Sequence, residues 1–370
     1  MKSFQKIQPI LKPLTSVLPT ANCQLPTAKC PIINAQCSMG KVLLLLLVSL
    51  LLITWSCEED FEINAPYKDI SVIFGLIDPG EDTIFLKINK AFLGDGNIVE
   101  MAKIEDSSTY IKGLTAFIEE WENGNYIKSY QLDTITIKNK EEGVFYNPYQ
   151  VIYYTPYQPV TSRQYRLKVS VNSKEITAVT NLVNDFSVIM PSAGSKFIQF
   201  KKNTEGVVKW ESAKYGKRYE VVIRIKYKEV WFDSPDTIYK YIDWGMGTKK
   251  SVTDNGGEEL KVTYSNDGFY TLISDTNNIL YGNATVEANV KERYTNDIDF
   301  IISVAAEEFN TYMEVNEPSN SIVQERPEYT NITNGIGIFT SRYKNIRTKK
   351  IHPETIVTIK SDLPELKFVY

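Results

Sequence analysis

The side chains that most often carry enzyme chemistry are scarce in this sequence. The chain has one histidine, His352, and four cysteines, at positions 23, 30, 37 and 57. A catalytic imidazole must be buried and oriented by its neighbours, whereas His352 stands in the basic stretch KKIHPET. A zinc site usually has four ligands, with two of them in a tight C-x₂-C pair, whereas Cys23, Cys30 and Cys37 are spaced evenly, seven residues apart. We therefore predict no catalytic residue, no metal and no cofactor.

Cys57 has a setting that predicts a different chemistry. It follows the apolar run Val42–Ile53, which is 12 residues long and is preceded by Lys41. A membrane-spanning helix needs about 20 apolar residues, and the core of a secretory signal needs roughly 7–15. The stretch TWSC, ending at Cys57, resembles the lipobox of a bacterial lipoprotein signal, with Thr54 where Leu is common. We predict that cleavage leaves Cys57 at the N-terminus, where it carries acyl chains such as palmitate; the alternative is a short uncleaved anchor.

The segment before this signal does not look like part of a folded protein. LPTANC and LPTAKC repeat with a period of seven residues between positions 18 and 30. Met39-Gly40-Lys41 is a better signal start than Met1. We therefore predict that translation begins at Met39 and that residues 1–38 are a mis-annotated upstream segment.

The net charge of the chain indicates which classes of molecule it could bind. Residues 1–56 hold five lysines and no acidic residue, so the remainder carries 36 basic and 45 acidic residues and a net charge of −9. Nucleic-acid binding requires concentrated positive charge, and we predict no nucleic-acid partner. All 23 tyrosines follow residue 57, and tyrosine favours β-strands.

Short alternating segments separated by turn residues predict antiparallel β structure. Apolar and polar residues alternate over Ile70–Leu76 and again over Ile84–Ile88, with Asp78-Pro79-Gly80 as the turn between them. Asn123-Gly124 predicts the tip of a hairpin, and Asn172-Ser173 predicts another. Strands at such regular spacing are typical of a β-sandwich.

The predicted fold is mostly β, with two antiparallel β-sandwich domains of the immunoglobulin or fibronectin III type and one short helix, Glu307–Val315. The stretch around Trp210 resembles strands B and C of a fibronectin III domain, and Pro191 and Gly194 interrupt the strand pattern before it. The predicted parts are the upstream segment 1–38, a lipoprotein signal peptide 39–56, an acidic tether 57–68, an N-terminal β-sandwich 69–183, a C-terminal β-sandwich-like domain 184–345 and a C-terminal tail 346–370.

The most specific motif lies near the end of the second predicted domain. After FIISVAA and EEFNTYME comes N-I-x-N-G-x-G-I-F, at Asn331–Phe339. Together with the lipobox and the opening VIFGLIDPGEDTIFLKINKAF, it resembles a Bacteroidota outer-membrane lipoprotein family that is catalogued as a domain of unknown function. The resemblance spans most of residues 57–342, and the tail departs from it. It implies a lipoprotein often encoded beside receptors energised by the TonB system, and it implies no known reaction.

Two stretches are candidates for a binding surface. VFYNPYQVIYYTPYQP holds five tyrosines among prolines, and a tyrosine ring suits both sugar stacking and protein interfaces; the alternative is a half-buried strand. The five tyrosines are Tyr146, Tyr149, Tyr153, Tyr154 and Tyr157.

The second stretch contains Asn334, Gly335 and Gly337, which predict a turn that contacts a ligand; the alternative is a strand that enters the core.

The tripeptide DTI occurs three times, with its threonine at Thr83, Thr134 and Thr237. It resembles the O-glycosylation site of exported Bacteroidota proteins, and the alternative is a polar entry into a strand. We treat the three threonines as candidate glycosylation sites.

We expect a lipid-anchored protein of the outer membrane, exposed at the cell surface because CEEDFE resembles an acidic surface-export signal. The expected role is an accessory or binding component beside a TonB-dependent receptor in nutrient uptake. A structural or adhesive surface module is the first alternative. An enzyme acting on glycosides is the second, and it would need two carboxyl groups about 5–10 Å apart across a cleft.

Overall fold

The computed structural model describes residues 70–91, 97–110, 112–234, 236–275, 288–317 and 328–369. These residues all belong to one compact unit, Ile63–Tyr370. The upstream segment 1–38, the signal peptide 39–56, Cys57 and the tether 57–68 lie outside the described residues. Expectations about those parts of the chain therefore stay predictions.

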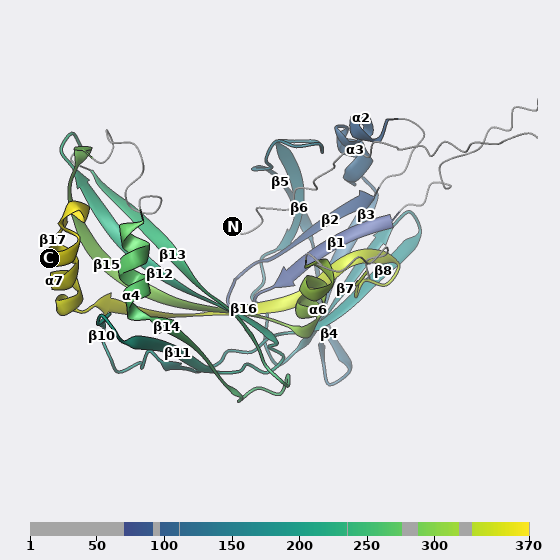
Figure 1. Ribbon diagram of the computed structural model, residues 1–370. Helices are drawn as coiled ribbons and strands as arrows, with labels where there is room; N and C mark the ends of the chain where they lie inside the picture. The colour runs from purple at the N-terminus through teal and green to yellow at the C-terminus, as the bar shows by residue number, and fades with distance from the viewer. Residues whose placement is uncertain are drawn as a thin grey trace, which may run out of the picture. The chain divides into compact units, whose positions relative to one another are not determined.

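The described chain is mostly β, as expected, and its strands form three sheets (Figure 1). The large sheet has the order β13 (Thr237–Lys250), β12 (Arg218–Trp231), β15 (Val290–Ala305), β16 (Gly335–Ile351), β1 (Ile70–Ile77), β2 (Ile84–Ala91), β6 (Tyr149–Thr155) and β5 (Asp133–Lys138), and β10 (Phe197–Ile198) and β17 (Phe368–Val369) pair with β16 and β15. A second sheet has the order β4 (Asn125–Gln131), β3 (Leu114–Glu122), β7 (Gln164–Val171) and β8 (Lys174–Asn181). A third has the order β14 (Glu259–Ser265), β11 (Glu205–Glu211) and β9 (Val188–Met190).

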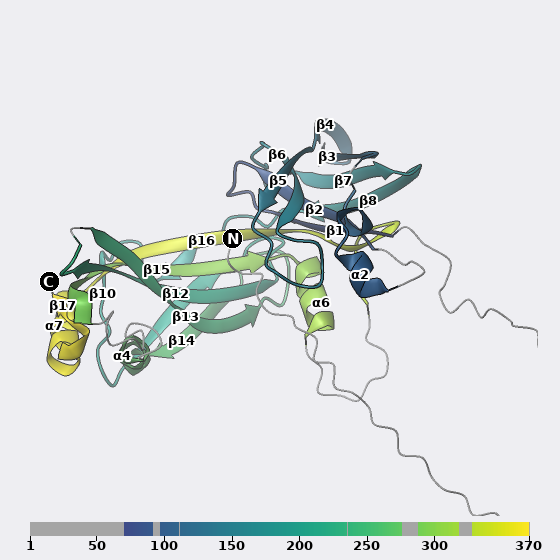
Figure 2. The same ribbon diagram turned by 90° about the horizontal axis from the view of Figure 1, so that it is seen from above.

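Strand β16 lies in the middle of the large sheet and joins its two halves, one formed by β13, β12 and β15 and the other by β1, β2, β6 and β5. Its first residues pair in parallel with β1, from Ser71 opposite Gly335 to Ile77 opposite Ser341. Its later residues pair antiparallel with β15, from Ala305 opposite Arg342 to Asp297 opposite Lys350. In Figure 2 the strand can be followed from one half of the sheet into the other.

Two hydrophobic clusters lie on one side of β16. Phe339 belongs to the cluster between β1, β2, β6 and the four-stranded sheet. Ile351 belongs to the cluster between β12, β15 and the three-stranded sheet. Because successive strand side chains point to opposite faces, these odd-numbered β16 residues share one face. We call it the inner face of the large sheet, and the opposite side the outer face.

The hairpins and turns follow their local sequence. Asn123 and Gly124 join β3 to β4 with φ of 50° and 81°. Asn172 and Ser173 join β7 to β8 with φ of 47° and 61°. Positive φ at both central residues is what a two-residue hairpin of the I′ type requires. Both predicted tips are confirmed.

The helices differ from the expectation of a single one. The predicted helix is present as α6 (Glu307–Asn316). The described residues also form α4 (Asn266–Ser274) and α7 (Pro353–Asp362), both of which contribute to the cluster beside the three-stranded sheet. Three further short helices are α2 (Ile98–Ala102), α3 (Glu105–Ser108) and the 3₁₀ turn η1 (Pro364–Leu366).

Residues 346–370, expected to form a tail, are structured over their described part. They complete β16 and then form α7, η1 and β17, which pairs with β15. Ile356, Ile359, Leu366 and Phe368 are buried in the hydrophobic cluster. Burial of four apolar side chains stabilises the fold. The segment is therefore part of the half that contains β12, β15 and the three-stranded sheet.

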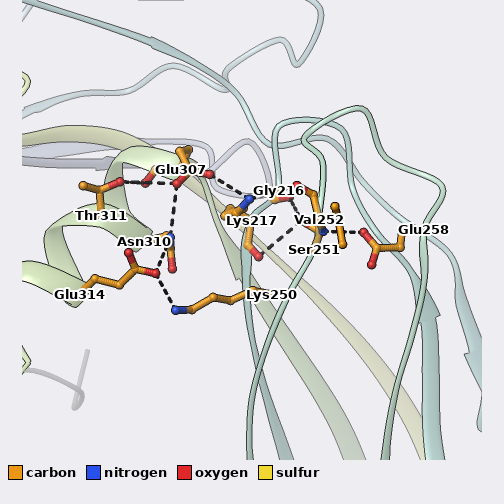
Figure 3. A network of polar contacts seen from close by, with 10 residues as sticks. All are labelled: Gly216, Lys217, Lys250, Ser251, Val252, Glu258, Glu307, Asn310, Thr311 and Glu314. Carbon is orange, nitrogen blue, oxygen red and sulfur yellow. Dashed lines mark hydrogen bonds and ion pairs between the residues drawn. The ribbon is translucent and has the colours of Figure 1, made fainter.

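Helix α6 lies against the outer face and is held there by a polar network (Figure 3). Lys217 and Lys250, at the ends of β12 and β13, pair with Glu307 and Glu314 at 3.3 Å and 2.6 Å. The buried amide of Asn310 donates to both acids. The helix therefore has a fixed place above the sheet.

Candidate binding surfaces on the large sheet

The most buried acidic side chains of the described residues are structural. Glu120 is 1% exposed and accepts hydrogen bonds from Tyr165 at 2.9 Å and from Tyr157, and it pairs with Arg163 at 2.7 Å. Burial raises the pKa of Glu120, but these partners outweigh it, so the pKa lies below its ordinary value. A carboxyl held ionised in this way is unsuited to general-acid catalysis.

Glu229 is held in the same manner in the other half. It is fully buried and pairs with Arg293 at 2.9 Å and with Lys240 at 2.7 Å. Burial raises its pKa, and the hydrogen bonds from Lys240 and Arg293 more than reverse that effect. Arg293 also donates to the Leu366 carbonyl at 2.9 Å. Glu229 therefore ties β12, β13 and β15 to the C-terminal segment.

Other candidates for chemistry have structural settings too. His352 caps the first turn of α7 by accepting from the Glu354 N–H. Burial raises the pKa of Glu308, whose carboxylate accepts from the Thr340 hydroxyl at 3.2 Å between α6 and β16. Among the described residues, no group of three or more histidine, cysteine or acidic side chains could hold a metal ion.

The predicted tyrosine cluster is split between the two faces of the large sheet. Tyr153 is buried in the core, and Tyr157 is half-buried, stacks on Tyr130 at 4.0 Å and donates to Glu120. Tyr154 points outward and stacks on Phe85, while Tyr149 is exposed and Tyr146 is half-buried. The five tyrosines do not form one surface, because the neighbours Tyr153 and Tyr154 point to opposite faces of β6 and Tyr157 packs against a hydrophobic cluster.

The glycine motif lies in the sheet and not in a loop, as the alternative reading expected. Gly337 has φ of +114°, and a Cβ there would lie 2.0 Å from the Ile73 carbonyl oxygen across the β1–β16 pair. The Asn331 side chain bonds both the N–H and the C=O of Phe339. Gly335 begins β16. Asn334, directly before it and next to the Thr333–Thr177 bridge to β8, donates its amide to the Glu175 carbonyl. The motif thus shapes the entry of β16 into the core.

The three DTI threonines sit where strands begin. Thr83 lies directly before β2, Thr134 is the second residue of β5, and Thr237 is the first of β13. Thr134 and Thr237 are exposed and Thr83 is half-buried. Their positions fit a polar strand entry, and O-glycosylation stays a prediction.

The outer face near the N-terminal strands carries an exposed apolar surface. In register, Val72 lies beside Ile336, Phe85 beside Tyr154, and Ile135 beside Ile152. Phe74, between these pairs, meets the α6 residue Tyr312 edge-on at 6.2 Å. We call this the apolar surface; its most exposed members are Phe74, Phe85, Ile135 and Ile336.

The outer face of β12 and β13 is polar and aromatic instead. Tyr239 and Tyr241 are 71% and 51% exposed. The Arg224 guanidinium lies over the Tyr241 ring at 4.2 Å and forms two hydrogen bonds to Asp243. Lys226 pairs with Asp299 at 2.5 Å. We call these six side chains the tyrosine–arginine surface.

Sequence patterns did not reveal the tyrosine–arginine surface. In the β13 stretch TIYKYID, Lys240 points to the inner face, where it pairs with the buried Glu229. A charged residue therefore stands at an inward position, and apolar and polar residues do not alternate as in a typical strand. The only local signal is the spacing Tyr-x-Tyr-x-Asp, which places three side chains on one face of a strand.

The described residues contain no helix long and apolar enough to cross a membrane. No family model matches the sequence, and no curated protein matches it.

Two solved structures are similar in part. The C-terminal globular domain of an oligosaccharyltransferase from Pyrococcus abyssi is 10% identical with a TM-score of 0.24, over 62% of this chain and 45% of that chain. Trypsin-activated alpha-2-macroglobulin from Escherichia coli is 8% identical with a TM-score of 0.16, over 66% of this chain and 15% of that chain. This chain therefore covers less than half the length of each of the two solved structures. At these scores neither similarity supports an inference about fold or function.

Proposed function

We propose that this chain is a lipid-anchored surface protein of the outer membrane that acts as a binding component beside a TonB-dependent receptor in nutrient uptake, and that it is not an enzyme. The proposal includes membership in the outer-membrane lipoprotein family that the sequence resembles. It also includes the assignment of each half to the immunoglobulin or fibronectin III-like sandwich type.

The observation that carries the binding role is the contrast between the two faces of the large sheet. The inner face is covered by the two smaller sheets through hydrophobic clusters. The apolar surface on the outer face leaves Phe74, Phe85, Ile135 and Ile336 each at least 40% exposed. Exposed apolar patches mark sites of protein association, and aromatic residues are enriched in such interfaces.

The settings of two buried acids favour binding over catalysis, and Glu308, whose pKa is raised by burial, accepts a hydrogen bond from the Thr340 hydroxyl. Glu120 and Glu229 have lowered pKa values because cations and hydroxyls hold them ionised. A glycosidase instead raises the pKa of one carboxyl and places the second across a cleft. A surface that associates with a receptor needs no such pair.

Receptor capture in native cells tests the proposal. The tagged full-length protein is cross-linked in intact cells and purified, and we expect a β-barrel receptor to co-purify with it. Phe85→Asp combined with Ile135→Asp should abolish capture, because both charges would be desolvated in the interface. Val357→Asp, at an exposed position of α7, is the matched control and should leave capture unchanged.

Two outcomes would contradict this role. One is wild-type protein that captures no outer-membrane receptor; the other is a double variant that captures as much as wild type. Wild-type protein that instead promotes attachment of cells to surfaces, in a manner sensitive to the same two substitutions, would favour the adhesive alternative.

A further inference from the structure

Two exposed tyrosines on one strand are the starting observation. Tyr239 and Tyr241 lie two residues apart on the same face of β13, so their Cα atoms are about 7 Å apart along the strand. Both are more than half exposed. Tyrosine combines a flat apolar ring with a polar tip and loses little entropy on binding. Together the rings form a short apolar track that runs along β13.

The charged side chains beside this track neutralise each other in pairs. Arg224 donates to both carboxylate oxygens of Asp243, at 2.6 Å and 2.7 Å. Lys226 pairs with Asp299, which also accepts from Thr348 at 2.7 Å. An anion would have to displace a carboxylate from either cation. The pairs nevertheless offer hydrogen-bond donors and acceptors side by side.

A shallow hollow of about 180 Å³ lies here, lined by Arg224, Lys226, Tyr227, Tyr239, Lys240 and Tyr241. Pockets that enclose a drug-sized ligand usually measure about 300–1,000 Å³. The hollow is therefore too small to enclose such a molecule. It suits one ring of a longer chain whose other units lie along the strand.

The ligand that fits has apolar ring faces and many hydroxyl groups. Each hydroxyl can donate to a carboxylate and accept from a guanidinium at once, which matches the Arg224–Asp243 pair. Pyranose rings present such an apolar face to an aromatic side chain. Nucleic acid and acidic glycans fit less well, because the cations at this surface are already paired.

We propose that the tyrosine–arginine surface binds an uncharged oligosaccharide, with Tyr239 and Tyr241 stacking on sugar rings and the Arg224–Asp243 pair holding hydroxyls. This rests on the proposed function only in taking the chain to be a binding protein, and it names a ligand class for that role. It uses a surface different from the apolar surface assigned to the receptor.

A purely structural role for these tyrosines makes a different prediction. Tyrosine favours exposed sheet positions, and cross-strand pairs such as Tyr241 with Lys226 stabilise a sheet. In that case replacing the tyrosines would lower the melting temperature and would change no ligand binding. The test must therefore measure both.

Isothermal titration of the full chain in detergent provides the test. The probes are linear hexasaccharides of α-1,4-glucose, β-1,4-glucose, β-1,4-xylose and β-1,4-mannose, with hexagalacturonate as the acidic probe. We expect at least one neutral probe to bind, with an affinity that changes little with salt because no ion pair is formed. Hexagalacturonate should bind more weakly than that probe.

Variants locate the binding. Tyr239→Ala with Tyr241→Ala should weaken it about tenfold or more, the effect expected of central aromatic contacts. Asp243→Asn should weaken it less, because one oxygen remains to accept. Tyr149→Ala, an exposed tyrosine of the other half, is the matched control and should leave affinity unchanged. Circular dichroism and melting temperature confirm that each variant is folded.

Several results would overturn the inference: no neutral hexasaccharide binds up to about 10 mM, the double tyrosine variant binds as well as wild type, or hexagalacturonate binds most tightly with strong salt dependence. Receptor capture depends on Phe85 and Ile135 and not on Tyr239 and Tyr241. Failure of the saccharide inference is therefore distinguishable from failure of the proposed function.

Discussion

At the scale of single residues, Gly337 is the position where the backbone leaves least freedom. Its φ of +114° is a conformation that side chains rarely adopt, and a Cβ would meet the Ile73 carbonyl oxygen at 2.0 Å. We expect Gly337→Ala to lower the free energy of unfolding by about 2–5 kcal/mol, from backbone strain and overpacking together. Urea denaturation measures this, with Gly143→Ala as a control because nothing lies within 4 Å there. A change as small as that of the control would mean that β1 and β16 can move apart freely.

The tyrosines of the predicted cluster should divide by their burial. Tyr153→Ala removes a core side chain that is 4% exposed and should cost about 3–5 kcal/mol. Tyr149→Ala should change stability by less than about 0.5 kcal/mol, because its ring is exposed. Thermal denaturation of the two single variants gives the comparison. The two rings lie on the same face of β6, four residues apart, so equal effects would contradict the difference in burial along the strand.

The sequence predicted the structure correctly where a few neighbouring residues decide the backbone conformation. Asn123-Gly124 and Asn172-Ser173 set their turns by their own backbone preferences. The N-I-x-N-G-x-G-I-F motif was visible, but its cause was not, since Gly337 is required by Ile73 on a strand far away in sequence. Contacts of that kind leave no trace in the residues on either side.

At the scale of elements, the strands were more predictable than the helices or their partners. Helix α7 holds the β-branched Ile356, Val357 and Ile359, and α4 contains Gly268, so both have weak helix propensity. Tertiary burial of one face overrides that preference. The parallel pairing of β16 with β1 could not be read from either strand, because alternation does not name a partner.

The buried Glu229 should be the most sensitive polar connection between elements. Glu229→Gln removes the negative charge that pairs at 2.9 Å with the Arg293 guanidinium, which is 1% exposed. Such a change costs about 3–5 kcal/mol. Lys240→Met removes the partner that reaches solvent and should cost clearly less. Denaturant unfolding of both variants decides this, and a cost under about 1 kcal/mol for Glu229→Gln would contradict the assigned role.

The same carboxylates predict how stability changes in acid. Glu120 and Glu229 both have a pKa lowered below the ordinary value of 4.5 in the folded state. Their contribution is therefore complete above pH 4.5 and is lost as the pH falls through the lower folded values. We expect the melting temperature to fall below pH 4.5, and to fall less steeply in Glu120→Gln and Glu229→Gln. Equal slopes in wild type and variants would show that other groups control the acid transition.

At the scale of the whole molecule, the two halves meet in one continuous sheet. Each half packs a part of the large sheet against a smaller sheet, through its own hydrophobic cluster. The composition break near residue 184 does not separate the two clusters completely, because Ile332 and Phe339 belong to the cluster formed mainly by residues before it. Two other features depend on long-range packing and could not be predicted from the sequence. Both clusters use side chains of β16, and the residues after 346 are buried in one of them.

The proposed lipid anchor is simple to test. We expect the mature protein to begin at Cys57 and to carry acyl chains. Cys57→Ser should give an unprocessed precursor without fatty-acid label, because the thiol that accepts the lipid is gone. Metabolic labelling and intact mass measure this, and protease treatment of intact cells reports whether the protein faces outward. A labelled and processed Cys57→Ser variant would contradict the lipid site, and a chain that is cleaved only after lysis would contradict surface exposure.

The position of β16 sets the order in which the chain can fold. Asp78, directly after β1, binds Arg342 of β16 across 264 residues of sequence. A chain that crosses a membrane from its N-terminus delivers β1 early and β16 almost last. Until then neither hydrophobic cluster is complete, and the edges of β1 and β15 lack their partner. Long-range pairing of this kind is slow, and open strand edges aggregate. The fold therefore makes late arrival of one strand the step that closes both halves, and on the proposed export route the new chain would need protection until β16 arrives.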